Sequence, residues 1–443
     1  MPINSLLYPS NVFVPTTYNV ANSCRFNSAS NDHLNRTQTA GNRRKFTFST
    51  WVKRCNPATR MALFLANRSG SNYDQLFLHE DGILEADFYH SGTQIFRYKT
   101  NALYRDPSAW YHMIMAVDTE HDTASSRVRI YVNGLEVTSF STETNPSENV
   151  DTHVNENSIV AYIGSDYNSN EPDYYLAETV MLDGTQATPT DFGEFDEDSG
   201  IWKPIDVSGL TFGTNGFYLD YKDSSALGND AAGSNNFTVN NLTAVDQSTD
   251  TCTNNFATIN SLDNYYAQAT FSNGNLTVVT PVSQYAYIRS TIAASSGKWY
   301  AELKITTASA ADNQHGIVSD AAINSTGGVG ERANAYGYRG SGQVVSGGSV
   351  VSYSAASYTA GDIISIAMDL DNNLIFFYKN GAIQNSGTGL AITAPASTTD
   401  GVYYFATSDN ANLGGGTYQF DWNFGSPPYA ISSGNTDGNG YGN

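Results

Sequence analysis

Two stretches of this chain have the same pattern, in which alternating residues run into Asn-Gly and continue beyond it. The first is RIYVNGLEV at residues 129–137, and the second is IFFYKNGAI at residues 375–383. Asn-Gly favours a type I′ turn, because both central residues of that turn need a positive φ. The alternation must keep register across the turn, or every side chain changes face. Each stretch therefore predicts a β-hairpin, and their separation predicts two different sandwiches.

The composition also favours strands. Aromatic residues make up 12% of the 443 residues, with 29 Tyr and 38 Gly, while charged residues make up only 15%. Aromatic and β-branched side chains fit pleated, half-buried surfaces, and long helical patterns of Ala, Glu, Lys and Leu are absent. We predict an all-β fold of two antiparallel β-sandwiches joined by an irregular Asn/Thr-rich connector, with little helix.

The formal net charge of −21 limits the partners of the chain. It repels nucleic acid and anionic membrane surfaces, and it is compatible with a neutral glycan or a basic protein surface. The alternative is that acidity only keeps an abundant protein soluble. We expect neither nucleic-acid binding nor membrane insertion.

The three cysteines and the N-terminus give further expectations. Cys24, Cys55 and Cys252 are odd in number and lack CxxC spacing, which argues against a disulfide scaffold. MPINSLLYPSNVFVP lacks the basic and apolar regions of a signal peptide. No apolar run approaches the about 18 residues of a membrane span. We therefore expect synthesis in the cytoplasm without a signal peptide.

The chain divides into five segments by sequence pattern. Residues 1–20 carry three prolines and scattered hydrophobic residues, which predicts an extended N-terminal arm. Residues 21–204 contain strand after strand, with Asp81-Gly82 as a hairpin turn and ATPTDF as the start of a short helix. Residues 205–264 are Asn/Thr-rich with little periodicity, and we interpret them as a connector or wrapping segment. Alternation resumes in residues 265–430, and residues 431–443 form a Gly/Asn-rich tail that we expect to be flexible.

Both sandwich segments resemble known families. FTFSTWVKR, WYHMIMAVD, RIYVNGLEV, YIGSDYN and YYLAETVMLDG occur in the order found in laminin-G-like, concanavalin-A-like jelly rolls, so residues 24–203 resemble that family. GKWYAELKI, AYGYRGSG, GDIISIAMDLDNNLIFFYKNG and FDWNFG give residues 270–428 a resemblance to SPRY domains. The resemblance implies binding rather than chemistry.

The pairing of these two domains is similar to structural proteins of bacteriophages, especially tail fibres and other exposed virion proteins. That resemblance implies a receptor-binding component on the exposed surface of the virion, which recognises a host-surface glycan or protein. It also implies a homo-oligomer, with a trimer favoured, that joins other virion proteins through the N-terminal arm. The alternative is a head or tail decoration protein that mainly contacts other virion proteins.

An enzyme is the less favoured interpretation. Concanavalin-A-like glucanases carry E-x-D-x-x-E on one strand, and in LEADFYH Glu85 and Asp87 match while His90 replaces the second Glu. Retaining hydrolysis needs two carboxyls about 5–5.5 Å apart, so losing one removes the mechanism. Leu84, Ala86 and Phe88 form an apolar face opposite Glu85, Asp87 and Tyr89, as in any half-exposed strand. HExxH, GxSxG and P-loop motifs are absent. We predict no catalytic residues.

No cofactor is predicted. DLDNN at residues 369–373 alternates oxygen ligands like a calcium loop, but Leu374 stands where the glycine should be, and the bidentate Glu is missing. We interpret it as a turn between two strands. A laminin-G-type calcium site stays open and cannot be placed on particular residues.

Sugar binding by β-sandwiches uses exposed aromatic rings beside amide and carboxylate groups, and loops carry such sites more often than strands. The alternative for any single Tyr is a structural role, since Tyr is common throughout. The candidate glycan- or receptor-binding residues are Tyr336, Tyr338, Arg339 and Tyr353 in the second domain and Asp166, Tyr167 and Asn168 in the first, with Glu85, Asp87 and Tyr89 as weaker candidates.

Overall fold

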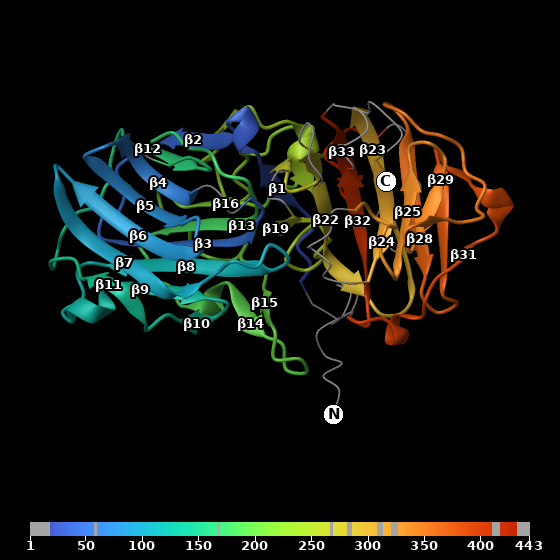
Figure 1. Cartoon of the computed structure of the whole chain (residues 1–443). Coiled ribbons are helices and arrows are strands. Elements are labelled where there is room, and N and C mark those ends of the chain that lie inside the picture. The colour runs from blue at the N-terminus through green and yellow to red at the C-terminus, as the bar shows by residue number, and fades with distance from the viewer. Residues whose placement is uncertain are drawn as a thin grey trace. The chain divides into compact units, whose positions relative to one another are not determined.

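The computed structural model describes residues 18–56, 60–166, 168–265, 269–280, 286–307, 313–319, 327–409 and 417–431. The chain divides into two compact units, a first that ends at Asn255 and a second that begins at Phe256 (Figure 1). In the described residues each helix is a single 3-10 turn: η1 (Ser28–Ser30), η2 (Ala124–Ser126), η3 (Pro189–Asp191), η4 (Ala244–Asp246), η5 (Asn385–Gly387) and η6 (Pro395–Ser397). The short helix predicted at ATPTDF is η3, which begins with a capping box between Thr188 and Asp191.

The first unit consists of two eight-stranded antiparallel sheets and a two-stranded ribbon. The β3 sheet has the order β10 (Leu135–Glu136), β9 (Val128–Val132), β8 (Trp110–Asp118), β3 (Lys45–Arg54), β13 (Tyr174–Asp183), β1 (Ser23–Phe26) and β18 (Gln247–Ser248), with β16 (Phe217–Leu219) also paired to β13. The β6 sheet has the order β11 (Phe140–Thr144), β7 (Thr93–Leu103), β6 (Ile83–His90), β5 (Asn72–Leu78), β4 (Met61–Ser69), β12 (Val160–Ile163), β2 (His33–Thr37) and β17 (Thr238–Asn240). The ribbon pairs β14 (Gly193–Phe195) with β15 (Trp202–Pro204).

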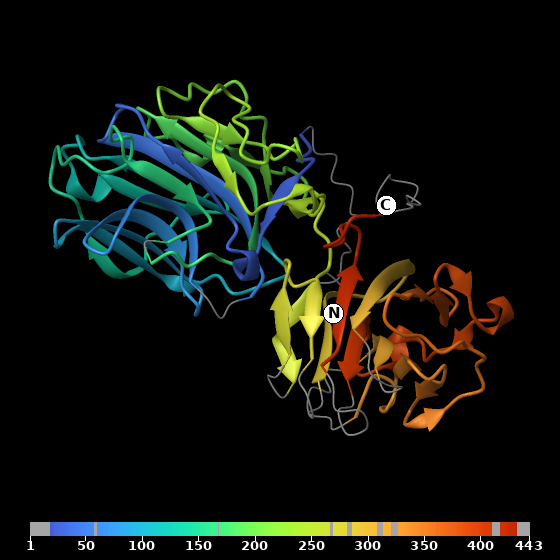
Figure 2. The same cartoon turned by 90° about the horizontal axis from the view of Figure 1, so that it is seen from above.

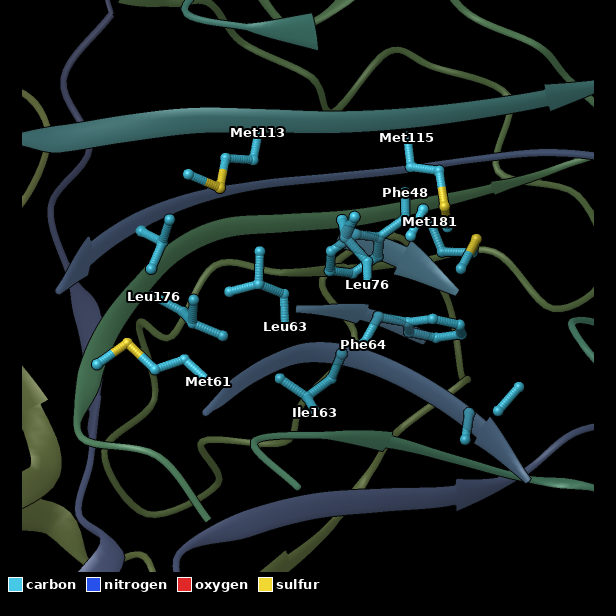
Figure 3. Packing of buried hydrophobic residues seen from close by; sticks show 14 of the residues in the cluster. Phe48, Met61, Leu63, Phe64, Leu76, Met113, Met115, Ile163, Leu176 and Met181 are labelled. Carbon is cyan, nitrogen blue, oxygen red and sulfur yellow. The ribbon is translucent and has the colours of Figure 1, made fainter. Parts of the chain in front are cut away.

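The main core of the first unit lies between these two sheets. Phe48, Met113 and Met115 of the β3 sheet meet Leu63 and Leu76 of the β6 sheet in one buried cluster (Figure 3). One residue in two on each strand reaches this cluster, because successive side chains of a strand point to opposite faces. The alternation seen in the sequence is therefore the pattern of a sandwich with two packed inner faces.

The first predicted hairpin is confirmed. Strands β9 and β10 pair around Asn133 and Gly134, whose φ angles are 49° and 80°. A Cβ at Gly134 would lie 2.3 Å from the ring of Trp202, so the turn also needs glycine for its close approach to that ring. Val128, Ile130 and Val132 all belong to the core cluster, as the shared face requires.

The first unit continues past the predicted end of the jelly roll at residue 204. The segment 205–255 is largely irregular, as predicted, but β16, β17 and β18 add to the two sheets and Phe217 and Phe237 enter the core. In Figure 2 this segment, green to yellow-green, lies over the strands of the first unit. Its backbone is held by amide side chains; for example, Asn215 accepts from the backbone N–H of Thr39 at 2.9 Å and donates to its carbonyl at 2.7 Å. In the structure, residues 205–255 pair with the sheets of the first unit, and the second unit begins at Phe256.

The second unit is built from two further antiparallel sheets. The β24 sheet has the order β19 (Ile259–Tyr265), β22 (Ala286–Ala294), β32 (Tyr403–Asp409), β24 (Gln314–Val318), β25 (Ala335–Arg339), β26 (Val344–Ser346) and β27 (Ser349–Val350). The β28 sheet has the order β20 (Thr270–Ser272), β21 (Thr277–Val279), β33 (Gln419–Asn423), β23 (Lys298–Thr307), β28 (Ile363–Asp369), β29 (Leu374–Lys379) and β30 (Ala382–Ile383), with β31 (Leu390–Ala391) paired to β29. Their inner faces share one buried cluster that includes Ile317, Ile366 and Trp422.

The second predicted hairpin lies in this unit. Strands β29 and β30 pair around Asn380 and Gly381, whose φ angles are 49° and 76°. The two Asn-Gly hairpins thus belong to different sandwiches, and the predicted all-β class of two antiparallel sandwiches is confirmed. Within the described part of the chain, no helix has the length and apolar character needed to span a bilayer.

The predicted arm and tail fall mostly outside the described residues, which begin at Tyr18 and end at Ile431. The described end of the arm packs on the first unit. Val20 is buried beside Trp51 and Trp110, and its backbone N–H donates to Thr253 at 3.0 Å. The Tyr18 hydroxyl donates to Glu178 at 2.8 Å. The jelly roll therefore holds residues 18–20.

Candidate functional site

The strand that carries LEADFYH is two-faced, as predicted. Leu84, Ala86 and Phe88 of β6 belong to the core cluster, so Glu85 and Asp87 lie on the outer face of the β6 sheet. The antiparallel register adds side chains from the two neighbouring strands to this face. They are Tyr73 opposite Tyr89, Gln75 opposite Asp87 and Phe77 opposite Glu85 on β5, and Arg97 opposite Asp87 and Lys99 opposite Glu85 on β7. We call this set, with Glu85, Asp87 and Tyr89, the polar face.

Glu85 is surrounded by basic side chains. Its Oε1 accepts from Arg97 Nε at 2.6 Å, its Oε2 lies 2.5 Å from His79 Nε2, and Lys99 Nζ lies 3.5 Å away. Burial by itself raises the pKa of this carboxyl, but the bonds from His79 and Arg97 outweigh burial and hold the pKa below its usual value. Glu85 is therefore ionised at neutral pH and has no proton to give to a leaving group.

Asp87 lies in a different environment on the same strand. Its Oδ2 accepts from the Tyr73 hydroxyl at 3.1 Å and its Oδ1 from Gln94 Nε2 at 2.5 Å. Burial raises the pKa of Asp87, and the bond from Gln94 opposes that rise. The Tyr73 and Tyr89 rings stack beside it, with centroids 5.6 Å apart and planes at 20°. The face thus combines a carboxylate with an aromatic pair.

Gln75 lies between Leu65 and Asp87 in the cross-strand register and is 0% exposed. Neither Oε1 nor Nε2 of its side chain has a hydrogen-bond partner among the described residues. A buried polar group left unpaired costs about 1–3 kcal/mol, so native structures pair nearly all of them. This amide is the one member of the polar face with unused hydrogen-bonding capacity on both of its ends.

His90 does not take the place of the second acid on the polar face. Its Nε2 bonds Asp74 Oδ1 at 2.7 Å, and its ring lies 3.9 Å from that of His153. Asp74 is opposite Phe88, whose side chain is in the core, so this cluster lies on the other face of the sheet from Glu85. The glucanase pattern places three acids on one strand. Strand β6 supplies two of them, Glu85 and Asp87, and its His90 points to the other face of the sheet.

A second pair that suggests catalysis is Ser49 with His112, where Ser49 Oγ lies 2.8 Å from His112 Nε2. The indole N–H of Trp202 donates to His112 Nδ1 at 3.0 Å. Since an indole only donates, Nδ1 accepts, and Nε2 carries the proton and donates to Ser49. Burial lowers the pKa of His112 to about 3. The imidazole cannot act as a base toward Ser49, so this pair is a packed core contact.

The aromatic candidates of the second unit are buried, in contrast to the exposed rings that the sequence suggested. Tyr336, Tyr338 and Tyr353 all belong to the core cluster. The Tyr336 hydroxyl accepts from Thr393 N at 2.8 Å, and the Tyr353 hydroxyl accepts from Phe377 N at 3.2 Å. The Tyr338 hydroxyl donates to the carbonyl of Ala356. The three rings pack in the core and their hydroxyls bond neighbouring backbone groups, so the rings are not available to stack on a sugar.

The remaining candidates have local roles in the structure. Arg339 pairs with Glu331 at the end of β25. Asp166 is buried, and its Oδ1 accepts from the backbone N–H groups of Asn168 and Asn170 at 2.8 and 2.9 Å, which fixes a tight loop. Asn168 is exposed, and Tyr167 lies outside the described residues. Among the predicted residues that the structure describes, Glu85, Asp87 and Tyr89 lie together on an outer sheet face, while Tyr336 and Tyr338 share a face that is in the core.

The stretch DLDNN is the turn between β28 and β29, as predicted, with Asn373 at a φ of 56°. Asp369 is used within the turn, where its Oδ1 accepts from Asn372 N at 3.1 Å. Among the described residues, no three or more His, Cys, Asp or Glu side chains are grouped so as to hold a metal ion.

Two family models match the chain in the regions that carry these features. Residues 28–178 match the concanavalin A-like lectin/glucanases superfamily, a span that includes all of β4 to β7 and thus the polar face. Residues 298–408 match the SPRY domain. The chain carries a concanavalin-A-like, laminin-G-type domain and a SPRY domain. A search of curated proteins finds no match.

Solved structures with a similar arrangement of strands are distant in sequence. The SPRY domain of human HERC1 is 15% identical, with 37% of this chain and 96% of that chain covered and a TM-score of 0.30. A candidate carbohydrate binding protein of Bacteroides ovatus is 16% identical, with 50% and 59% covered and a TM-score of 0.36. Domains LG4-5 of the mouse laminin α1 chain are 12% identical, with 88% and 83% covered and a TM-score of 0.31. At these identities and TM-scores, the similarities do not identify a ligand of this chain.

Proposed function

We propose that this chain is a ligand-binding protein and that the polar face of the first unit holds a glycan. Sugars present hydroxyl groups at the edge of each ring and apolar C–H groups on its faces. The stacked Tyr73 and Tyr89 rings suit the apolar faces, and Asp87 and Arg97 beside them suit the hydroxyls. The match of this region to a superfamily of lectins and glucanases supports the same class of ligand.

The observation that carries the proposal is the Gln75 amide. A sugar hydroxyl donates one hydrogen bond and accepts others, so it satisfies both ends of an amide that has no partner among the described residues. Because Gln75 is covered, a ligand reaches it only when longer side chains of the face move aside. Arg97, whose side chain is 38% exposed, has the freedom to do so.

The site binds without cleaving. Glycoside hydrolysis needs one carboxyl with a raised pKa as general acid and a second carboxyl that is free to act on the sugar or on water. The pKa of Asp87 is raised, but Glu85 is buried and its two oxygens are engaged by Arg97 and His79, so it is not available as the second carboxyl. Glu85 acts as the fixed anion that orients these two side chains. The chain is in this proposal a lectin-like module rather than a glucanase.

The biological setting is proposed from the pairing of the two domains, which resembles exposed structural proteins of bacteriophages. In this setting the chain is a tail-fibre or receptor-binding component on the virion surface that recognises a host glycan. Gold-labelled antibodies against the chain, imaged on intact particles, are expected to mark the tail fibres. Labels on the head would instead favour the alternative of a decoration protein, and unlabelled particles would remove the virion proposal.

The glycan site is tested by affinity gel electrophoresis of the full chain on native gels that each contain one neutral polysaccharide: dextran, mannan, galactomannan or xyloglucan. At least one is expected to retard the protein. Asp87→Asn and Tyr89→Ala are expected to weaken that retardation by about tenfold each, since each removes a sugar contact worth roughly 1.4 kcal/mol. The same mixtures are expected to release no reducing ends.

Ser141→Ala is the matched control, because Ser141 is exposed on β11 at the edge of the same sheet. It is expected to migrate as the wild-type chain does. Equal retardation of all three variants would place the ligand elsewhere. Release of reducing ends that disappears in Glu85→Gln would show that the face is catalytic.

A further inference from the structure

The outer face of the β28 sheet in the second unit carries large apolar side chains. Ala301, Leu303, Ile364, Ile366 and Phe377 point into the core, so their neighbours along β23, β28 and β29 point outward. The register places Tyr300 opposite Ala367 and Ala367 opposite Phe376, while Glu302, Ser365, Tyr378 and Ile383 form the next row. We call Tyr300, Phe376, Tyr378 and Ile383 the aromatic platform.

The platform is open to solvent in the described structure. Tyr300 is 57% exposed and Ile383 is 42% exposed, while Phe376 and Tyr378 are half-buried. Large apolar side chains gathered on one sheet face, unlike single exposed ones, indicate a binding surface. Residues 298–408, which match the SPRY domain, include all four.

Side-chain size gives the platform its shape. The central strand β28 contributes only Ser365 and Ala367 between the larger residues of β23 and β29. Neighbouring strands are about 4.8 Å apart, so the backbones that carry Tyr300 and Phe376 are about 10 Å apart. The Tyr300 hydroxyl donates to Glu302 Oε2 at 2.8 Å, two residues along the same strand, so its ring leans along β23. Two aromatic rings thus flank a low strip, far enough apart to contact two successive rings of one ligand.

The carboxylates around the platform are already engaged in bonds to neighbouring side chains. Glu302 accepts from Tyr300 and from Asn423 Nδ2 at 3.0 Å, and Asp369 pairs with Lys298 at 3.2 Å. Asp421 accepts from the hydroxyls of Thr277 and Thr306, at 2.7 Å each. A charged ligand would have to break these bonds, and an anionic one would also meet a chain of net charge −21. The surface fits a neutral ligand with hydroxyl groups.

The area of the platform argues against a protein partner. A fully buried aromatic side chain removes about 150–250 Å² from water, and these four are exposed only in part, so they offer on the order of 300 Å². A stable protein interface buries about 800 Å² on each partner. We propose that the aromatic platform is a second glycan site of this chain, which binds at least two consecutive sugar rings of a neutral polysaccharide. The rings stack on Tyr300 and Phe376, and their hydroxyls bond Glu302.

The proposal is independent of the site on the first unit, and its test keeps the two apart. The full chain carrying Asp87→Asn, which weakens the polar face, is run on native gels containing dextran, mannan, galactomannan or xyloglucan. At least one polysaccharide is expected to retard it. Adding Tyr300→Ala with Phe376→Ala is expected to weaken that retardation by about tenfold or more. Tyr300→Trp, which keeps an aromatic face and reports on folding, is expected to retain it.

Val350→Ala is the control, since Val350 is 55% exposed in the same unit on the other sheet. It is expected to leave migration unchanged. The proposal is overturned if no gel retards the Asp87→Asn chain, or if the Tyr300→Ala, Phe376→Ala variant is retarded as strongly as its parent. A change in oligomeric state of that variant in size-exclusion chromatography would also overturn it, because the platform would then contact protein.

Discussion

Replacing Asp250 by alanine is expected to lower the free energy of unfolding of the first unit by about 3–5 kcal/mol. Asp250 and Lys53 are both buried, and Asp250 Oδ2 lies 2.7 Å from Lys53 Nζ. Removing one partner of a buried ion pair leaves the other charge without compensation in a medium of low polarity. Lys53 also donates to Asn255 Oδ1 at 2.8 Å, but a neutral amide does not replace a full negative charge.

The pair also explains why the first unit needs residues beyond 204. Lys53 lies near the end of β3, a central strand of its sheet, and Asp250 is in the segment that wraps the jelly roll. Trp110 of β8 donates its indole N–H to Asp250 Oδ1 at 3.2 Å. The carboxylate therefore fastens the end of the wrapping segment to two strands, and its loss acts on both the charge balance and the packing.

The measurement is a urea titration of the full chain followed by tryptophan fluorescence, since Trp51, Trp110 and Trp202 lie in the first unit. Glu136→Ala is the matched control, because Glu136 pairs with Arg129 at 3.0 Å on the exposed surface, and such pairs contribute about 0–1 kcal/mol. Lys53→Met with Asp250→Leu removes both charges and is expected to recover most of the stability. Equal unfolding midpoints for Asp250→Ala and Glu136→Ala would contradict the assignment.

The fold followed from the sequence where strands were long enough to show alternation. Strands β3, β6, β8 and β29 each run for six residues or more with one apolar face, and the Asn-Gly turns give their hairpins a local cause. Strands β16, β17 and β18 have two or three residues, too few to show a period of two. The segment 205–255 therefore resembled a connector, although tertiary contacts make it part of the first unit.

The polar face was predicted only in part, because its members come from three strands. Glu85, Asp87 and Tyr89 follow from alternation in β6. Their partners Gln75 and Arg97 follow only from pairing register, which the Glu80-Asp81-Gly82 turn and a bulge in β7 set. Counting outward from a two-residue Asp81-Gly82 turn would place Gln75 opposite Phe88, whereas the observed register pairs it with Asp87. The turn read from the sequence is therefore off by one residue in register, and it would have put Gln75 on the wrong face.

The error at Tyr336 and Tyr338 has a different origin. The two tyrosines are two residues apart on β25, so their side chains point to the same face of the sheet. That face packs into the core of the second unit. The neighbouring glycines gave the stretch the pattern of a loop. The glycines are there instead for close packing, since a Cβ at Gly337 would lie 2.0 Å from the carbonyl oxygen of Val329. Tyr300 and Phe376 were missed because exposed faces of strands give no signal in a sequence beyond the residue type.

Glu178 is expected to make the stability of the first unit depend on pH. It is buried at a bulge of β13, with a φ of 49°, and accepts from the hydroxyls of Tyr18 and Tyr218 at 2.8 Å. Burial raises its pKa from 4.5 to about 7, and the two hydroxyls oppose that rise. Lys222 also lowers the pKa, while Asp220 raises it.

The sign follows from proton binding in the two states. Between pH 4.5 and about 7 the folded state holds a proton on Glu178 that the unfolded state has lost. Stability is therefore highest below pH 4.5 with respect to this group, and it falls as pH rises through 7. The total loss is roughly 3 kcal/mol, from 1.36 kcal/mol for each pKa unit. Asp32, whose pKa burial raises to about 6, acts in the same direction, so the contribution of Glu178 must be isolated.

Glu178→Gln isolates it, because the amide has nearly the same shape, does not titrate and can still bond both tyrosine hydroxyls. Urea unfolding of the wild-type chain and of this variant is measured at intervals from pH 4.5 to 8. The two free energies of unfolding are expected to be similar at pH 4.5, and the variant is expected to be more stable by roughly 3 kcal/mol at pH 8. The slope that remains in the variant reports the other carboxyls whose pKa burial raises, which are Asp32, Asp87 and Asp173. Asp32→Asn combined with Glu178→Gln is expected to flatten it further. Parallel curves for the wild type and Glu178→Gln would mean that the buried carboxyl keeps its ordinary pKa, and that the two tyrosine hydroxyls compensate fully for its burial.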